Sequence, residues 1–232
     1  MATVIPLPSS SITSSGAAAL TWLEIARRVR KEAGLSGDDN DPSSVDDQEG
    51  EMLSVINWVK DAWLRIQGRR KWDWQWESEA VTILAGTNAT EGSISADRYV
   101  LDATWAGTRQ MTYLPWAEFR QAFPSAQITD GDSPEYWSIR PDRAFVVSAM
   151  PTADLTLTVE RYVNPTTIGT DDEYPSLPAH QHMAIVWRAV MLYAGFDEAG
   201  SLYEHAKGEF KVVMSEAVID DTPTLEVGAP LC

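Results

Sequence analysis

The chain has 232 residues, of which 44% are hydrophobic, and it carries a formal net charge of −16. This length allows one substantial hydrophobic core or two small ones, and the apolar fraction is ordinary for a globular protein. The charge argues against a protein that grips nucleic acid, because phosphates are bound by basic surfaces, and no apolar run approaches the roughly 18 residues that read as a membrane span.

The negative charge is concentrated in the later part of the chain. Residues 1–70 contain 10 acidic and 8 basic residues, whereas residues 71–232 contain 24 acidic and 10 basic residues. Such a surface should repel DNA, yet an acidic wall would also keep a moving polyanion from sticking to it. The single cysteine, Cys232, excludes an intrachain disulfide and fits a reducing compartment.

The first predicted helix follows a Ser- and Pro-rich stretch, residues 1–19, which we expect to be a flexible arm rather than a signal peptide. Thr21 and Glu24 have the spacing of a capping box, in which each side chain satisfies a free backbone N–H group of the other. Gly34 can end the helix. The helix contains one apolar stripe and, towards its C-terminal end, a set of cations that suits its dipole. The stripe is Trp22, Ile25, Ala26, Val29 and Ala33, and the cations are Arg27, Arg28, Arg30 and Lys31.

An acidic connector, residues 36–50, precedes a second predicted helix that continues to Gln67, with Gly68 as a plausible stop. After this helix the hydrophobic period changes. Trp72, Trp74 and Trp76 recur at every second residue, which is the period of a β-strand. This pattern predicts a strand whose tryptophans share one face.

The middle of the chain reads as a β-rich insert of short strands separated by Pro, Gly and Asp turns. Proline at the first turn favours one short helix over residues 115–123. The expected strands cover residues 81–84, 98–104, 108–114, 133–142, 144–150 and 154–163.

Helical spacing returns near the C-terminal end. Residues 179–194 are apolar nearly all round, so this helix should be buried, and Gly195 should break it. Residues 197–218 should form a fourth helix that is apolar on one side. A buried helix needs cover, so we expect the two helix pairs to meet in one four-helix bundle.

The predicted fold is therefore α+β, with a β-rich insert lobe between two helix pairs. The expected parts are a flexible N-terminal arm, one discontinuous helical domain, the insert and an extended C-terminal tail. Their bounds are 1–19 for the arm, 20–71 and 175–219 for the helical bundle, 72–174 for the insert and 220–232 for the tail.

Catalytic and metal-binding motifs are not evident. His180 and His182 are two residues apart and do not share a helix face, although Asp171, Asp172 and Glu173 lie upstream. The chain has no G-x-S-x-G, no P-loop and no G-x-G-x-x-G, so no cofactor is expected. Residues 38–41 lack the order of a calcium loop. A hydrolase needs only two carboxylates, and 34 acidic residues leave such a pair open but unlocated.

The tryptophan row and the basic cluster before it each admit two interpretations. The three indoles could stack sugars, as in a carbohydrate-binding module, or they could fill an aromatic core or subunit interface. Acidic residues alternate with them, which disfavours nucleic acid. Arg69, Arg70 and Lys71 could compensate a helix dipole or pair with an acidic neighbouring subunit.

Two motifs resemble those of tailed-phage head-to-tail adaptor proteins. The first joins an Ala-Trp-x-x-Ile-Gln helix end to a Trp-x-Trp pair, and the second is a Leu-Pro-x-x-x-His-x-Ala-Ile-Val-x-Arg-Ala stretch. The resemblance covers roughly residues 20–80 and 175–220 and is less distinct between them. The matching residues are 62–67 with 71–76, then 177–189, Tyr193, Ala194, Glu198, Ala199, Tyr203, Glu204 and Ala206.

The resemblance implies a structural, non-enzymatic protein of the virion neck, made in the bacterial cytoplasm. About twelve copies would form a ring under the portal protein, receive a tail tube or nozzle protein, and let double-stranded DNA pass without specific binding. A virion-associated peptidoglycan hydrolase and a carbohydrate-binding module remain the alternatives. The tail would contact the portal through Asp220, Asp221, Thr222, Pro223, Leu225, Val227, Pro230 and Leu231. Subunit or tail contacts would involve Arg69, Arg70, Lys71, Trp72, Trp74 and Trp76.

Overall fold

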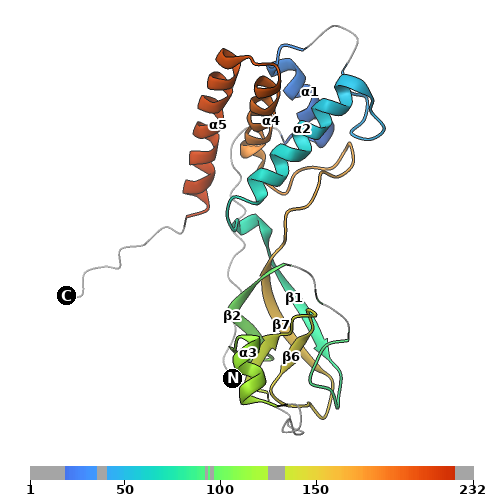
Figure 1. Cartoon of the computed structure of the whole chain (residues 1–232), viewed down its shortest axis with the longest axis vertical. Helices are drawn as coiled ribbons and strands as arrows, with labels where there is room; N and C mark the ends of the chain where they lie inside the picture. The colour runs from blue at the N-terminus through green and yellow to red at the C-terminus, as the bar shows by residue number, and fades with distance from the viewer. Residues whose placement is uncertain (1–18, 36–40, 92–93, 95–96, 125–133, 223–232) are drawn as a thin grey trace, which may run out of the picture. The chain divides into compact units, whose positions relative to one another are not determined.

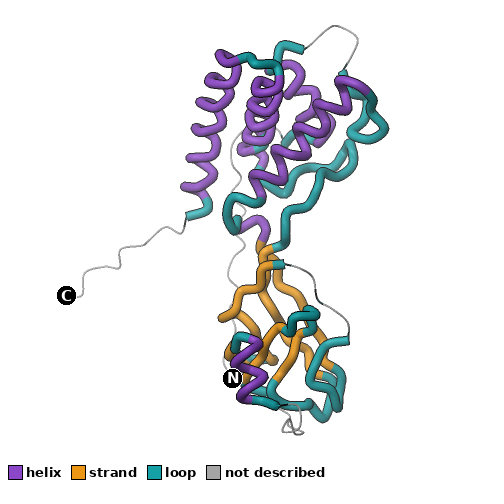
Figure 2. The backbone as a smooth tube through the Cα atoms, viewed as in Figure 1, coloured by secondary structure: helices purple, strands orange, loops and turns teal. Residues whose placement is uncertain are grey.

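A computed structural model describes residues 19–35, 41–91, 94, 97–124 and 134–222, and every structural statement below concerns these residues. The chain divides into two compact units. One unit combines Met1–Ile66 with Thr167–Cys232, and the other is Gln67–Thr166. The first is helical and the second contains the strands, which confirms the predicted α+β class (Figures 1 and 2).

The helical unit brings together helices from the two ends of the chain. Its described elements are α1 (Trp22–Glu32), α2 (Gly50–Gln67), the short 3₁₀ helix η3 (Ala179–Gln181), α4 (Met183–Phe196) and α5 (Gly200–Asp220). The apolar stripe predicted for α1 is buried. The buried residues of α2 also recur with helical spacing: Val55, Ile56, Val59, Ala62, Trp63 and Ile66.

The start of α1 is fixed by its own sequence and by a distant loop. The predicted capping box is present: the Thr21 N–H donates to Glu24 Oε2 at 2.8 Å, and the Glu24 N–H donates to Thr21 Oγ1 at 3.3 Å. The Trp22 N–H donates to the Glu173 carbonyl oxygen at 3.0 Å. The first turn is therefore tied to a loop about 150 residues later, which a local pattern does not reveal.

Helix α4 is the most buried helix of this unit, as its uniform hydrophobicity predicted. It contacts both α1 and α5 (Figure 1). The Trp58 ring of α2 lies 5.4 Å from the Tyr193 ring of α4. The predicted break at Gly195 is wrong, because α4 continues to Phe196. Glycine lowers helix propensity by about 1 kcal/mol, which does not end a helix that tertiary packing stabilises.

The Gln67–Thr166 unit holds seven described strands in two small sheets. The strands of the four-stranded sheet follow the order β1-β7-β2-β3, and those of the three-stranded sheet follow β4-β5-β6. The strands are β1 (Trp76–Ile83), β2 (Arg98–Ala106), β3 (Arg109–Gln110), β4 (Thr112–Tyr113), β5 (Tyr136–Ile139), β6 (Phe145–Val147) and β7 (Leu155–Tyr162). Helix α3 (Trp116–Ala122) confirms the short helix predicted there.

The last strand of the insert organises its first sheet. Strand β7 pairs antiparallel with β1 on one side and with β2 on the other. The core of this unit includes Trp137 and Phe145, whose rings stack with centroids 4.4 Å apart, and the buried Leu157 of β7. Aromatic and aliphatic side chains of both sheets thus share one apolar core.

The tryptophan row does not form the predicted strand. Residues Asp73–Gln75 form a 3₁₀ turn, η1, and β1 begins only at Trp76. The Gln75 N–H donates to the Trp72 carbonyl oxygen at 2.9 Å, which closes the turn. The side chain of Gln75 is buried, whereas Trp76 is 44% exposed. The alternation of tryptophans with polar residues suggested a strand with one face in solvent. The polar residue between Trp74 and Trp76, Gln75, is instead buried.

Candidate assembly interface

The three tryptophans predicted as a contact surface lie in different environments. Trp72 is 1% exposed, Trp74 is half-buried, and Trp76 is exposed on β1. The rings of Trp72 and Trp74 stack with centroids 6.1 Å apart. The Trp76 indole N–H instead donates to Glu160 Oε2 of β7 at 3.0 Å. The indoles therefore do not form one exposed platform of the kind that stacks sugars.

The basic cluster lies just beyond the end of α2, and two of its three cations lie over aromatic rings. The Arg70 guanidinium is 5.2 Å from the centroid of Trp72, and Lys71 Nζ is 5.3 Å from that of Tyr162. Cation–π contacts of this kind are worth about 0.5–1 kcal/mol at exposed sites. Arg69 is exposed. The cluster thus helps to cover aromatic residues at one end of the β unit. We call this end, where the first and last residues of the unit meet, its base.

Two glutamines that the sequence analysis did not single out tie this base together. Gln67 Nε2 donates to the Thr166 carbonyl oxygen at 2.7 Å, and the Thr166 N–H donates to Gln67 Oε1 at 3.0 Å. Gln75 Nε2 donates to the Val163 carbonyl oxygen at 3.3 Å, and the Val163 N–H donates back to the Gln75 carbonyl oxygen at 2.8 Å. The first and last segments of the unit are therefore clamped side by side.

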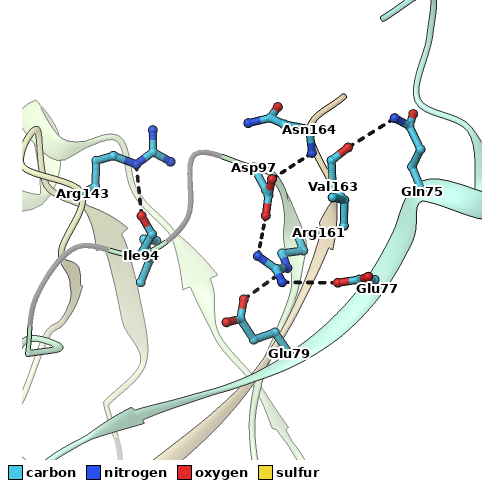
Figure 3. Close-up of polar contacts among 9 residues, drawn as sticks. All are labelled: Gln75, Glu77, Glu79, Ile94, Asp97, Arg143, Arg161, Val163 and Asn164. Carbon is cyan, nitrogen blue, oxygen red and sulfur yellow. Dashed lines mark hydrogen bonds and ion pairs between the residues drawn. The ribbon is translucent and has the colours of Figure 1, made fainter. Parts of the chain in front are cut away.

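Arg161 of β7 links three carboxylates (Figure 3). Its guanidinium lies 3.2 Å from both Glu77 and Glu79 of β1, and it also pairs with Asp97, just before β2. Asp97 accepts a further hydrogen bond from the Asn164 N–H at 2.8 Å. One side chain on the central strand thus braces both of its neighbours.

Arg161 stays charged in this setting. Burial would lower its pKa, but the charges of Glu79, Asp97 and Glu77 outweigh that effect and raise the pKa of Arg161. The Asp97 side chain is only 9% exposed. A partly buried charge is tolerated when it is paired and hydrogen-bonded, so this cluster suits a structural brace rather than a proton donor.

His182 connects Leu20, which lies two residues before α1, to the segment that leads into α4. Its Nδ1 accepts the Leu20 N–H at 2.9 Å, so its Nε2 carries the proton and donates to the Leu177 carbonyl oxygen at 3.0 Å. Burial lowers the pKa of His182, which favours this neutral form. Both ring nitrogens are occupied by backbone groups and not by a ligand.

The neighbouring residues hold the end of α5. His180 Nε2 lies 2.8 Å from Asp220 Oδ2, and Gln181 Nε2 donates to the same oxygen at 3.1 Å. The hydrogen bond from His180 lowers the pKa of Asp220. Together with His182, the η3 turn therefore fixes where both terminal segments meet the helical unit.

Most of the residues predicted to bind the portal lie outside the described residues. Asp220 ends α5, and Asp221 and Thr222 follow it in a turn. Pro223, Leu225, Val227, Pro230 and Leu231 are not among the described residues, nor are residues 1–18 of the predicted arm. Their contacts remain predictions.

The described part of the chain lacks both a metal-binding cluster and a helix able to span a membrane. It contains no group of three His, Cys, Asp or Glu side chains arranged to hold a metal ion. Among the same residues, no helix combines the length and hydrophobicity needed to cross a membrane. The most connected polar cluster of the β unit, around Arg161, is paired internally.

A comparison with known protein families identifies the family of this chain. The family model for SU10 adaptor protein matches residues 20–224. The chain belongs to the SU10 adaptor family. This confirms the resemblance to phage head-to-tail adaptors, and the match extends through the β insert, where the motifs were least distinct. A search of curated proteins found no match. Membership of this adaptor family indicates a phage structural role and a place in the virion.

Proposed function

We propose that this SU10-family adaptor is a structural connector that forms a ring of about twelve copies beneath the portal and joins it to the tail. The observation that carries the proposal is the family match over residues 20–224, which spans both helix pairs and the insert. A single function must therefore account for both compact units.

In this proposal the two units contact different partners. The helical unit, proposed as a four-helix bundle of residues 20–71 and 175–219, faces the portal, and the insert of residues 72–174 receives a tail tube or nozzle protein. The extended tail, residues 220–232, reaches onto the portal. The η3 contacts support this role, because Asp220 is held by His180 and Gln181 at the start of that tail.

The base of the β unit supplies the contacts to neighbouring subunits or the tail. Trp76 is the exposed indole of the tryptophan row, and Arg69 and Lys71 are exposed beside it in sequence. Trp72 and Trp74 stack on each other in the same segment. Arg161 and the Gln67–Thr166 clamp hold the first and last segments of this unit together.

The chain's charge fits a passage for DNA rather than a binding site. With a net charge of −16, copies in a ring present an acidic surface that repels the phosphate backbone. DNA then moves through the channel without specific contacts during packaging and ejection.

Catalysis is not part of the proposed function. A cell-wall hydrolase would need a carboxyl group with a raised pKa beside a second carboxylate. The carboxyl groups of Asp142 and Asp220 have lowered pKa values, because they accept hydrogen bonds from Arg140 and His180 respectively. A zymogram of the purified protein tests this directly: no lytic band is expected.

Genetic depletion tests the connector role. A phage with a nonsense codon in this gene, grown in a non-suppressing host, should accumulate DNA-filled or leaking heads and separate tails in electron micrographs. Supplying the intact gene from a plasmid should restore joined particles. Joined, infectious particles made without the protein would contradict the proposal.

A further inference from the structure

The outer face of α1 is basic. Arg27, Arg28 and Lys31 are exposed, lie within little more than one turn of each other, and share this face with Glu24. Arg27 Nε donates to the Pro42 carbonyl oxygen at 3.1 Å, and Arg28 pairs with Glu32 at 2.8 Å. The face therefore consists of cations that are held in place yet open to solvent.

This face is also hollowed. A depression of about 440 Å³ runs along it, so side chains from another surface have room to seat there. Leu20 and the aliphatic stems of the three cations offer an apolar floor, and the charged groups of these cations offer a basic rim beside the carboxylates of Glu24 and Asp41. The lining residues are Leu20, Glu24, Arg27, Arg28, Lys31 and Asp41.

The basic face stands out because the rest of its unit is strongly acidic. The sequence of the helical unit contains 21 acidic and 9 basic residues, a net charge of −12. Four of those nine basic residues belong to α1. Copies of such a unit repel each other in most orientations, and α1 is where the acidic surface of another copy is attracted.

Helix α5 presents a complementary face. Val212 and Ile219, seven residues apart and hence on one side of the helix, are 57% and 71% exposed. Glu209 and Glu216 are exposed beside them. Gly208 lies on the same line, with open space where a side chain would be. This combination of apolar and acidic groups matches the apolar floor and basic rim on α1.

The two faces lie on different flanks of the helical unit. Helix α4 contacts both α1 and α5 and lies between them (Figure 1). A contact between the α5 face of one copy and the α1 face of the next is therefore head-to-tail rather than self-complementary. Head-to-tail contacts generate rings when their rotation closes.

We propose that the α5 face of one copy docks on the α1 hollow of the next copy, and that this contact builds the ring. This inference rests on the proposed connector function and adds to it the surfaces through which the copies meet. Val212 and Ile219 seat over Leu20 and the cation stems. Glu209 and Glu216 lie opposite the basic rim.

Cross-linking in purified particles tests the geometry. In a Cys232→Ser background, particles carrying Lys31→Cys together with Val212→Cys are treated with a short bis-maleimide. The double variant should give a ladder of cross-linked copies, whereas either single variant should give no dimer. Dimers from one single variant would reveal a self-complementary contact, and a cross-link from position 31 to the portal would assign the hollow to another partner. Either result, or a double variant without a ladder, overturns the proposal.

Charge reversal tests the chemistry. Arg28→Glu with Lys31→Glu, or Glu209→Lys with Glu216→Lys, should each lower the yield of infectious particles at least tenfold, and the four changes combined should restore it. As a matched control, Glu209→Lys and Glu216→Lys are combined instead with Glu118→Lys and Arg120→Glu, which change exposed charges on α3 rather than α1, and this combination should not restore the yield. Melting temperatures of the free variants report folding separately.

The outcomes separate the two proposals. Failure of the combined variant to restore yield, with all variants folded, overturns the docking of α5 on α1 but leaves the connector function standing. Absence of the wild-type protein from purified particles removes the connector function itself.

Discussion

Replacing single tryptophans should separate the core of the β unit from its exposed surface. Trp72 is 1% exposed, stacks on Trp74 and is covered by Arg70, so Trp72→Ala leaves a cavity in a packed site. Truncating a buried aromatic side chain costs about 3–5 kcal/mol. Trp76 is 44% exposed, so its loss removes a smaller buried surface than the loss of Trp72, together with one hydrogen bond to Glu160. Such a bond contributes about 0.5–1.5 kcal/mol.

Urea unfolding of the full chain, followed by circular dichroism, measures this difference. With a denaturant slope of about 2 kcal/mol per molar, Trp72→Ala should lower the midpoint of the β unit's transition by roughly 1.5–2.5 M, whereas the loss of the Trp76 hydrogen bond corresponds to roughly 0.3–0.8 M. Trp72→Phe is the matched control and should recover part of the loss. Equal shifts for Trp72→Ala and Trp76→Ala would refute the assignment of Trp72 to the core.

Three further substitutions test the remaining features of the fold. Arg161→Met leaves the buried Asp97 carboxylate without its cation and should lower the free energy of unfolding by about 3–5 kcal/mol. Arg140→Met, in an exposed pair, should cost at most about 1 kcal/mol, and equal losses would contradict the role of Arg161 as a brace. Because burial lowers the pKa of His182 below 6.5, protons bind the unfolded chain first, so stability should fall as pH drops below 6.5, by at most about 1.4 kcal/mol per pH unit. His182→Gln should flatten this slope in urea titrations from about pH 7 to 5, and an unchanged slope would contradict the buried, neutral His182. Thr21→Ala removes the cap of α1 and should cost about 1 kcal/mol in the same titrations, and no change would mean that the distant loop alone fixes the helix start.

The helices were predictable because their signals are local. The capping box at Thr21 and Glu24, the glycine stop after α1, and the uniform hydrophobicity of α4 all act within a few residues. Each of these signals can be read from the sequence of one segment alone. The error at Gly195 is small, because glycine lowers helix propensity by only about 1 kcal/mol and α4 runs one residue beyond it.

The base of the β unit was not predictable from local patterns. Gln75 is polar and alternates with tryptophans, so it resembles a solvent-facing strand residue, yet it is buried by hydrogen bonds to Val163, far along the chain. Arg161 finds its partners only after β7 has entered the sheet between β1 and β2. The order of strands in a sheet depends on long-range pairing, and residue period alone does not determine it.

Cryo-electron microscopy of the neck of the phage particle tests the central claim most directly. We expect a closed ring of this SU10-family adaptor in direct contact with the portal, with α5 of each copy against α1 of the next. A neck in which the portal contacts the tail with no density for this chain between them would contradict it.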